Sequence, residues 1–257
     1  MNRIDHLFSG KKRNILSIFC TAGYPLLNDT MIVLRALQDS GVDMIELGMP
    51  YSDPIADGPV IQQSSFKSLE NGMTMAVLFE QLKHMRDEIN VPVILMGYLN
   101  PVLQFGFDKF CAMARSCGID GIILPDLPMH EFETSYKKTV DKHGLDFIFL
   151  VTPESSKERL EKIDALTSGF IYAVTSSSTT GGTIDKADQE IYFRRLAGSG
   201  LKHPFVVGFG IRERSDFLTA CQYGSGAVIG SAYIAAVNAG HDLRSTTRQF
   251  VKGILGG

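Results

Sequence analysis

Glu46, Asp53 and Asp57 are three acidic residues within a dozen positions, and their types and spacing suit acid–base chemistry. The stretch that contains them, residues 43–62, reads DMIELGMPYSDPIADGPVIQ. It begins with the composition of a strand, in which alternation places Glu46 on the same face as Met44 and opposite Leu47. A buried ionised acid without a partner is energetically unfavourable, so Glu46 is expected to be paired, protonated or retained for chemistry.

Asp53 and Asp57 follow in the loop after this strand. Each precedes a proline or a glycine, which restricts or shapes the backbone there. Acids placed this closely at the end of a strand predict a catalytic or binding site. The alternative is a solvated, charged loop beside an incidental buried glutamate, but solvated loops seldom interleave apolar and acidic residues in this way.

Short apolar strands that alternate with amphipathic helices are expected to position these acids. About eight strand-then-helix units in about 250 residues predict a TIM (β/α)8 barrel, an α/β fold whose short apolar strands form a parallel sheet covered by helices. A short N-terminal helix that contains Ile4, Leu7 and Phe8 and extra C-terminal helices complete the prediction. The expected strands are 15–21, 44–47, 91–96, 119–124, 145–151, 169–174, 205–208 and 226–229, and the expected helices are 29–40, 64–70, 75–89, 107–117, 131–143, 157–166, 188–197, 212–222, 231–237 and 242–254.

An open, doubly wound sheet is the structural alternative. It would normally carry a Gly-x-Gly-x-x-Gly turn after its first strand, whereas the chain has CTAGYP, with one glycine, at that place. The barrel is therefore favoured. With 257 residues and 44% hydrophobic residues, the chain is expected to form one well-buried domain over residues 1–257.

Charge and hydropathy exclude several classes of function. The net charge is −3 and the basic residues are scattered, so no surface for nucleic acid is expected. The sequence shows no signal-peptide core and no apolar run long enough to span a membrane, which predicts a cytoplasmic protein. The four cysteines lack metal-ligand spacing and are expected to be small buried hydrophobic residues in a reducing compartment: Cys20, Cys111, Cys117 and Cys221.

The segments that follow the strands form the predicted active-site face, because the chemistry of a barrel lies at the carboxyl ends of its strands. None of these segments ends a strand with a lysine or a histidine, which argues against a Schiff-base aldolase, an imidazole metal site or a triad. Carboxylates, hydroxyls, aromatic residues and glycines remain. The segments are FCTAGYP, ELGMPYSDP, MGYLNP, LPDLP, LVTPE, AVTSSSTTGG, GFGIR and IGSAY.

Glycines gather after the last three strands and predict a phosphate site. Gly181 follows the sixth expected strand, Gly210 the seventh, and Gly230 with Ser231 the eighth, where a helix begins. Backbone amides at a helix N-terminus bind anions, and the loops after the last two strands are the usual place for this in barrels. Tight turns that need glycine for backbone reasons are the alternative for any single glycine.

The segment TSSSTTGGTIDKAD, residues 175–188, has no apolar rhythm and is rich in serine, threonine and glycine. It predicts a mobile loop that is long enough to close over a substrate. Composition alone supports a plain flexible connection equally well.

With these motifs in place, the chain resembles the alpha subunits of tryptophan synthase. IELGMPYSDPIADGPVIQ is similar to the signature around the two catalytic acids of that family. FCTAGYP, LMGYLNP, IILPDLP, STTGG, VGFGI and VIGSA match its other strand-end motifs in the same order, so the resemblance covers essentially the whole chain.

The resemblance implies a retro-aldol cleavage of indole-3-glycerol phosphate to indole and glyceraldehyde 3-phosphate, without a metal or an organic cofactor. It also implies a beta-subunit partner in an alpha-beta-beta-alpha heterotetramer, faced by Asp53 and the segment around Asn100 and Pro101. Glu46 matches the catalytic glutamate and Asp57 the catalytic aspartate. The other matching positions are Phe19, Ile61, Tyr98, Tyr172 and Phe209 for the indole pocket, Gly181, Gly210, Gly230 and Ser231 for the phosphate, and Thr180 for a loop threonine that touches the aspartate on closure.

Two further hypotheses are weighed against this one. Another sugar-phosphate barrel, such as an isomerase or the synthase that makes indole-glycerol phosphate, is possible by fold, but that synthase resembles a chain with catalytic lysines at strand ends. A barrel kept only as an activator or a ligand-binding module would be expected to have damaged acids, and both Glu46 and Asp57 are present.

Overall fold

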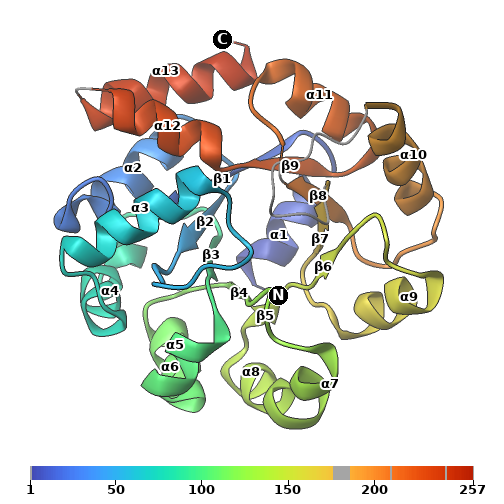
Figure 1. Ribbon diagram of the computed structural model, residues 1–257, viewed down its shortest axis with the longest axis horizontal. Helices are drawn as coiled ribbons and strands as arrows, with labels where there is room; N and C mark the ends of the chain where they lie inside the picture. Colours follow the sequence, from blue (N-terminus) through green and yellow to red (C-terminus); the bar gives the residue numbers. More distant parts are fainter. Residues whose placement is uncertain (1, 176–185, 209, 241, 257) are drawn as a thin grey trace.

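The strands of the computed structural model, which describes residues 2–175, 186–208, 210–240 and 242–256, form one parallel sheet. The order of the strands is β5-β4-β3-β2-β1-β9-β8-β7-β6, and the two end strands are consecutive in the chain, so the sheet curls into a barrel that helices surround (Figure 1). The predicted TIM barrel is confirmed. The strands are β1 (Ile15–Thr21), β2 (Met44–Gly48), β3 (Val93–Met96), β4 (Gly121–Ile123), β5 (Asp146–Phe147), β6 (Leu150–Val151), β7 (Ile171–Val174), β8 (Phe205–Gly208) and β9 (Gly226–Ile229).

Helices follow most strands and cover the outside of the barrel. Within the described ranges, no helix combines the length and the apolar character that crossing a bilayer requires. The helices are α1 (Arg3–Gly10), α2 (Thr30–Asp39), α3 (Pro59–Glu70), α4 (Met75–Leu82), α5 (Leu99–Phe105), α6 (Phe107–Ser116), α7 (Met129–Glu131), α8 (Lys137–His143), α9 (Lys157–Leu166), α10 (Lys186–Ala197), α11 (Arg214–Tyr223), α12 (Ser231–Ala239) and α13 (Leu243–Leu255). Shorter turns are 3₁₀ at Leu27–Asp29 and Met85–Asp87 and π at Phe132–Tyr136.

The structure differs from the expected elements in several places, of which the following lie near the predicted site or change the number of elements. The expected strand 145–151 divides into β5 and β6. Helix α3 begins at Pro59, five residues earlier than expected, because proline is well suited to the first position of a helix. The short helix α5 was not expected, and its Pro101 lies in the first turn, where a missing backbone N–H is tolerated.

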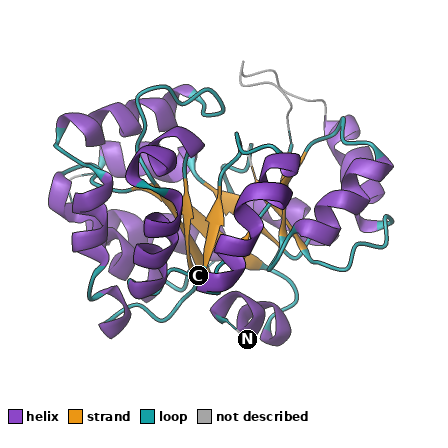
Figure 2. Cartoon of the chain, turned by 90° about the horizontal axis from the view of Figure 1, so that it is seen from below, coloured by secondary structure: helices purple, strands orange, loops and turns teal. Residues whose placement is uncertain are grey.

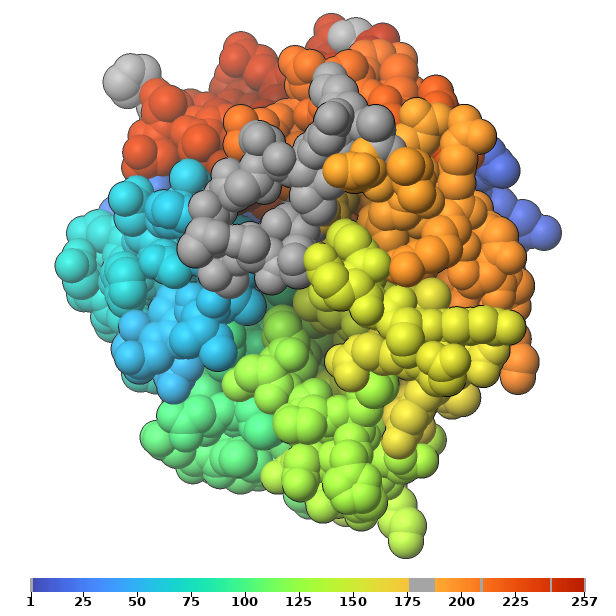
Figure 3. Space-filling view, turned by 45° about the vertical axis from the view of Figure 1, so that its right-hand side comes forward, coloured from blue at the N-terminus to red at the C-terminus, as the bar shows by residue number. Residues whose placement is uncertain are grey.

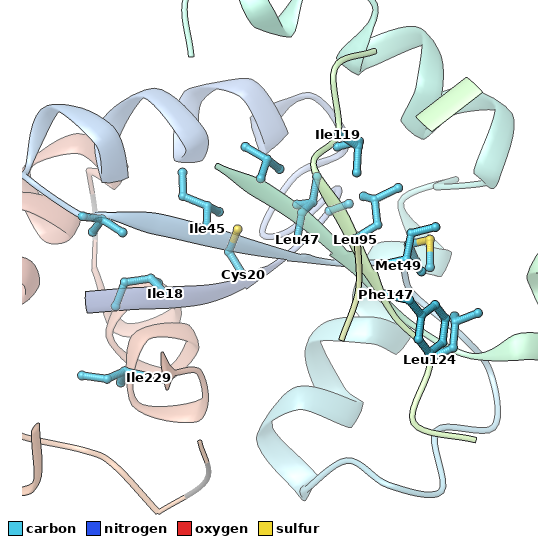
Figure 4. Packing of buried hydrophobic residues seen from close by; sticks show 14 of the residues in the cluster. Ile18, Cys20, Ile45, Leu47, Met49, Leu95, Ile119, Leu124, Phe147 and Ile229 are labelled. Atoms are coloured by element: carbon cyan, nitrogen blue, oxygen red, sulfur yellow. The ribbon is translucent and has the colours of Figure 1, made fainter. Parts of the chain in front are cut away.

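Two separate apolar cores result from the alternation of side chains along the strands. Met44, Ile94 and Val228 belong to the core inside the barrel, whereas Ile45 and Leu47 belong to the core between strands and helices. Figure 4 shows part of the outer core, with strand side chains packed together. Alternation in the sequence predicts that Glu46 shares the face of Met44, and that face is the barrel interior.

The N-terminal helix α1 covers the amino ends of the strands (Figure 2). Ile4 is fully buried in the inner core. The Asn2 amide donates to Asp146 Oδ2 at 2.5 Å, and Arg3 Nη1 pairs with Asp120 Oδ1 at 3.1 Å. The helix therefore closes the end of the barrel that lies opposite the loops predicted to hold the site.

Candidate active site

Glu46 lies inside the barrel in the middle of β2, paired in register with Phe19 on β1 and Ile94 on β3. Its side chain is 0% exposed. The Ser17 hydroxyl donates to Oε1 at 3.4 Å, and Oε2 has no hydrogen-bond partner within the described part of the chain. Burial raises the pKa of Glu46 to about 8, although the Ser17 hydrogen bond lowers it. Glu46 is therefore mainly protonated at neutral pH.

Asp57 occupies the loop between β2 and α3. The Tyr98 hydroxyl donates to Asp57 Oδ2 at 3.0 Å and accepts the Ala56 N–H at 2.9 Å. The Gln62 amide donates to the Asp57 carbonyl at 2.8 Å, which holds the loop to the first turn of α3. Burial raises the pKa of Asp57 to about 6, and the Tyr98 hydrogen bond opposes that rise. Asp57 is therefore mainly ionised at neutral pH, in contrast to Glu46.

A cavity of ≈ 110 Å³ lies at the carboxyl ends of the strands. Figure 3 shows this face, on which segments drawn in blue, green and yellow border a depression. A smaller cavity adjoins the first one and adds Tyr98 to its lining. Seven residues that the sequence predicted for the site line the larger cavity, namely Phe19, Asp57, Ile61, Tyr172, Gly210, Gly230 and Ser231.

The two ends of the larger cavity differ in chemistry. Gly230 is the N-cap of α12, whose first residue is Ser231, so backbone N–H groups are directed at this end. Gly210 has φ +76°, a conformation that glycine adopts without strain. The arrangement suits an anion at this end, while aromatic and aliphatic side chains with Asp57 form the other end.

Two glycines make room for the aromatic side chains. A Cβ atom at Gly208 would overlap the Tyr172 ring, and a Cβ atom at Gly48 would approach Phe19 Cζ to 2.5 Å. The sequence indicated Gly208 only as part of a glycine-bearing turn and gave no role to Gly48. Aromatic side chains on the adjacent paired strands explain both positions, and this pairing is visible only in the folded chain.

Comparison with known proteins adds to this geometry. A family model described as tryptophan synthase alpha chain matches residues 7–253. The chain belongs to this family. Members of the tryptophan synthase alpha chain family are lyases that cleave indole-3-glycerol phosphate, so the predicted family, reaction and enzyme class are confirmed.

Relatives in the tryptophan synthase alpha chain family match nearly the full chain. The alpha chain of Parabacteroides distasonis is 51% identical over 235 residues, which are 91% of each chain. That of Christiangramia forsetii is 46% identical over 99% of this chain and 98% of its own. Among solved structures, the alpha subunit of Legionella pneumophila str. Paris matches with a TM-score of 0.90 and 31% identity, over 99% of this chain and 97% of its own.

Three predicted site residues, Thr180, Gly181 and Phe209, lie outside the described residues, as does most of the loop predicted at 175–188. Helix α10 begins at Lys186, two residues before the expected helix. The four cysteines are free and buried, as the sequence predicted. Within the described ranges, no group of three or more His, Cys, Asp or Glu side chains has the geometry to hold a metal ion.

The residues that the resemblance assigned to the partner surface line a different cavity, of ≈ 360 Å³. Asp53, Asn100 and Pro101 border it, together with Tyr51 and Met49. The Asn100 amide donates to the Tyr51 hydroxyl at 3.1 Å. The loop after β2 therefore contributes Asp57 to the active-site cavity and Asp53 to this second one.

Proposed function

We propose that Glu46 is the general acid and base of indole-3-glycerol phosphate cleavage and that Asp57 stabilises the positive charge that develops on the indole ring. One observation carries this assignment: Glu46 in the middle of β2 and Asp57 in the loop after β2 have surroundings that set their pKa values at about 8 and about 6. With pKa values this far apart, Glu46 is the protonated acid and Asp57 is the anion at neutral pH.

The reaction adds a proton to an indole ring carbon and removes a proton from a hydroxyl group of the glycerol phosphate chain. Protonated Glu46 gives its proton to the indole ring carbon that bears the glycerol phosphate chain. The resulting carboxylate then accepts the proton of the side-chain hydroxyl as the carbon–carbon bond breaks, which releases indole and an aldehyde and restores protonated Glu46. No electrons are exchanged with an outside group.

Asp57 acts on the ring nitrogen. Protonation of the ring carbon places positive charge on that nitrogen, and a carboxylate that accepts its N–H stabilises the charge as it forms. Because this interaction is strongest in the transition state, it accelerates the reaction instead of only tightening binding. The Tyr98 hydroxyl, 3.0 Å from Asp57 Oδ2, supports the ionised form.

The proposed substrate orientation follows the chemistry of the cavity. The indole ring lies among apolar side chains and the phosphate lies at the glycine-bearing end. We assign the ring pocket to Phe19, Ile61, Tyr98, Tyr172 and Phe209, the phosphate contacts to Gly181, Gly210, Gly230 and Ser231, and contact with Asp57 on closure to Thr180.

We also propose that residues 1–257 form one domain that works in the cytoplasm with a beta subunit, in an alpha-beta-beta-alpha heterotetramer. Indole then passes to the beta subunit for tryptophan synthesis. A tryptophan synthase structure from M. tuberculosis, matched with a TM-score of 0.87 and 29% identity over 99% of this chain and 98% of its own, supports such an assembly. The cavity bordered by Asp53 and Asn100 is the proposed place of contact.

Indole release from indole-3-glycerol phosphate tests the proposal. The purified chain is assayed alone and with a beta subunit, beside Glu46→Gln. We expect indole from the wild type, a higher rate with the beta subunit, and a loss of orders of magnitude in Glu46→Gln. A wild-type chain that binds the beta subunit but releases no indole in either condition would show that the barrel is only an activator.

A further inference from the structure

Arg212 is the second charged residue that lines the larger active-site cavity, beside Asp57. The two reach the cavity from different loops, one after β2 and the other after β8. Asp57 adjoins the apolar lining, whereas Arg212 lies two residues beyond Gly210, on the side of the glycine-bearing turns. In the sequence, Arg212 is the last residue of the GFGIR segment, and no local pattern there predicts a role for it.

Hydrogen bonds hold the backbone of Arg212, while its guanidinium has no ionic partner among the residues that the structure describes. Its N–H donates to Asp216 Oδ2 at 2.9 Å, and the Glu213 N–H donates to the same oxygen at 3.3 Å. Glu213 Oε1 accepts the Ser215 hydroxyl at 2.6 Å. Both nearby carboxylates are therefore engaged by other donors, and within the described residues the exposed Arg212 guanidinium forms no ion pair.

The backbone amides at the glycine-bearing end of the cavity supply only partial positive charge. The residues predicted for the phosphate, such as Gly210, Gly230 and Ser231, bring no cationic side chain. A phosphate monoester carries between about one and two negative charges at neutral pH, and a guanidinium fork matches its oxygens in geometry as well as in charge.

We propose that Arg212 binds the phosphate of the substrate and adds a charged contact to those of the backbone amides. The inference rests on the proposed function, which places the phosphate at this end. An unpaired cation at the rim of the cavity also attracts a dianionic substrate before it is bound. Arg212 is thereby a binding residue that separates phosphorylated from unphosphorylated indole-glycerol, and it takes no part in proton transfer.

The proposed contact with the phosphate predicts which kinetic constant changes when Arg212 is substituted. The phosphate is not altered in the reaction, so its contacts are alike in the ground state and the transition state. Loss of such a contact raises KM and leaves kcat nearly unchanged. The attraction is electrostatic, so the contribution of Arg212 also weakens as salt is added.

The test compares Arg212→Gln and Arg212→Lys with Arg248→Gln, which removes the same charge from an exposed position on α13. KM and kcat for indole-3-glycerol phosphate are measured at low and high salt, with glycerol 3-phosphate as a competitive probe. We expect KM and the inhibition constant of the probe to rise about tenfold to a hundredfold in Arg212→Gln, with kcat within about twofold. Arg212→Lys should recover part of the loss, and Arg248→Gln should match the wild type.

The outcomes distinguish this proposal from the proposed mechanism. If Arg212→Gln keeps the wild-type KM and probe affinity, or lowers kcat alone, Arg212 does not bind the phosphate. If Glu46→Gln retains wild-type activity while Arg212→Gln still raises KM, the acid–base assignment is wrong and the phosphate contact stands. Melting curves of the Arg212 variants, expected to equal that of the wild type, exclude an effect through folding.

Discussion

The two ends of the barrel bury acidic side chains in opposite ways. At the amino ends of the strands, Asp120 is 1% exposed and accepts Arg86 Nη2 at 2.5 Å, Arg3 Nη1 at 3.1 Å and the Val93 N–H at 3.0 Å. Nearer the carboxyl ends, in the middle of β2, Glu46 is equally buried but has, among the described residues, one long contact with the Ser17 hydroxyl. One acid is held by two cations and an amide, and the other by a neutral donor.

The difference separates stability from function. The ion pairs of Asp120 with Arg3 and Arg86 compensate its burial, and they tie α1 and the segment before β3 to the start of β4. A buried carboxyl group with only neutral partners keeps its proton at neutral pH, which is what a general acid needs. The burial of Glu46 is therefore unfavourable for stability but supports chemistry, whereas the burial of Asp120 is compensated by its ion pairs.

The largest effect is expected for Glu46→Gln, which should lose activity and gain stability together. The amide cannot donate and recover a proton as the acid does, so kcat should fall about a thousandfold. Burial raises the pKa of folded Glu46 to about 8 from its ordinary value of 4.5. Between these values the unfolded state binds fewer protons than the folded state, so wild-type stability falls as pH rises.

The side-chain amide of the Glu46→Gln variant does not titrate. The stability advantage of the variant should therefore grow from about pH 4.5 to about pH 8 and reach a few kcal/mol, on the order of the pKa difference. Urea unfolding of both proteins at several pH values measures it. An advantage that is absent, or that shrinks as pH rises, would mean that Glu46 is charged in the folded state and would remove the contrast between the two ends.

Arg86→Met should produce the reverse pattern at the other end. Besides the ion pair, Arg86 donates to the carbonyl groups of Gly118, Ile89 and Val91 at 2.7–3.0 Å. Methionine fills similar volume but leaves Asp120 with weaker compensation, so the free energy of unfolding should fall by about 3 kcal/mol.

The folded fraction of Arg86→Met should keep wild-type kcat, because the substitution lies at the closed end of the barrel. Arg248→Met on α13 is the matched control and should change stability by less than about 0.5 kcal/mol. A kcat that falls with Arg86→Met at full folding would show that the amino end of the barrel influences catalysis.

The sequence predicted the fold and the inward position of Glu46 because those features depend on short patterns. Alternation along β2 was enough to place Glu46 inside the barrel, and the strands β1, β8 and β9 begin and end at the predicted residues. Apolar periodicity determines which face of an element is buried, and the strand ends then gather on one face of the barrel. The inward face of Glu46 and the place of Asp57 in the loop after β2 could therefore be predicted without coordinates.

Features that depend on partners distant in the chain could not be predicted in this way. Ser17 lies 29 residues from Glu46, and Asp120 lies 117 residues from Arg3. The role of Gly208 depends on the Tyr172 ring, and the position of Arg212 depends on how the loop after β8 turns toward the cavity. No local pattern specifies these contacts, because each is set by the register and packing of the closed barrel.

A smaller effect is expected for Tyr98→Phe, which removes the neutral donor of Asp57. The Tyr98 hydrogen bond lowers the pKa of Asp57 against the effect of burial, so its loss should raise that pKa above about 6. Less Asp57 is then ionised at neutral pH, and kcat should fall up to about tenfold at about pH 7, with partial recovery at about pH 8. The acidic limb of the pH–rate profile measures the shift.

Tyr51→Phe is the matched control for Tyr98→Phe. The ring centroids of Tyr51 and Tyr98 are 5.3 Å apart, and the Tyr51 hydroxyl accepts a hydrogen bond from the Asn100 side-chain amide, whereas the Tyr98 hydroxyl donates to Asp57. The acidic limb of Tyr51→Phe should equal that of the wild type. Equal shifts in both variants would assign the effect to ring packing and not to the hydrogen bond.

Ser17→Ala is expected to have the smallest effect and tests the neutral donor of Glu46 directly. The hydrogen bond is long, at 3.4 Å, and it lowers the pKa of Glu46, so its removal should raise that pKa by less than about half a unit. Glu46 must be protonated at the start of the reaction, so the alkaline limb of the kcat profile should move to higher pH. Cys20 and Tyr172, the other titratable side chains that interact with Glu46, have pKa values raised by burial and stay neutral through this range.

Ser68→Ala makes the same substitution at an equally buried serine that donates to the Ala22 carbonyl and not to an acid. It should leave the alkaline limb in place. If Ser17→Ala instead moves that limb to lower pH, the serine disfavours the charged form of Glu46. The carboxyl end would then hold its acid neutral through a specific contact as well as through burial, and the contrast with the paired Asp120 would become sharper.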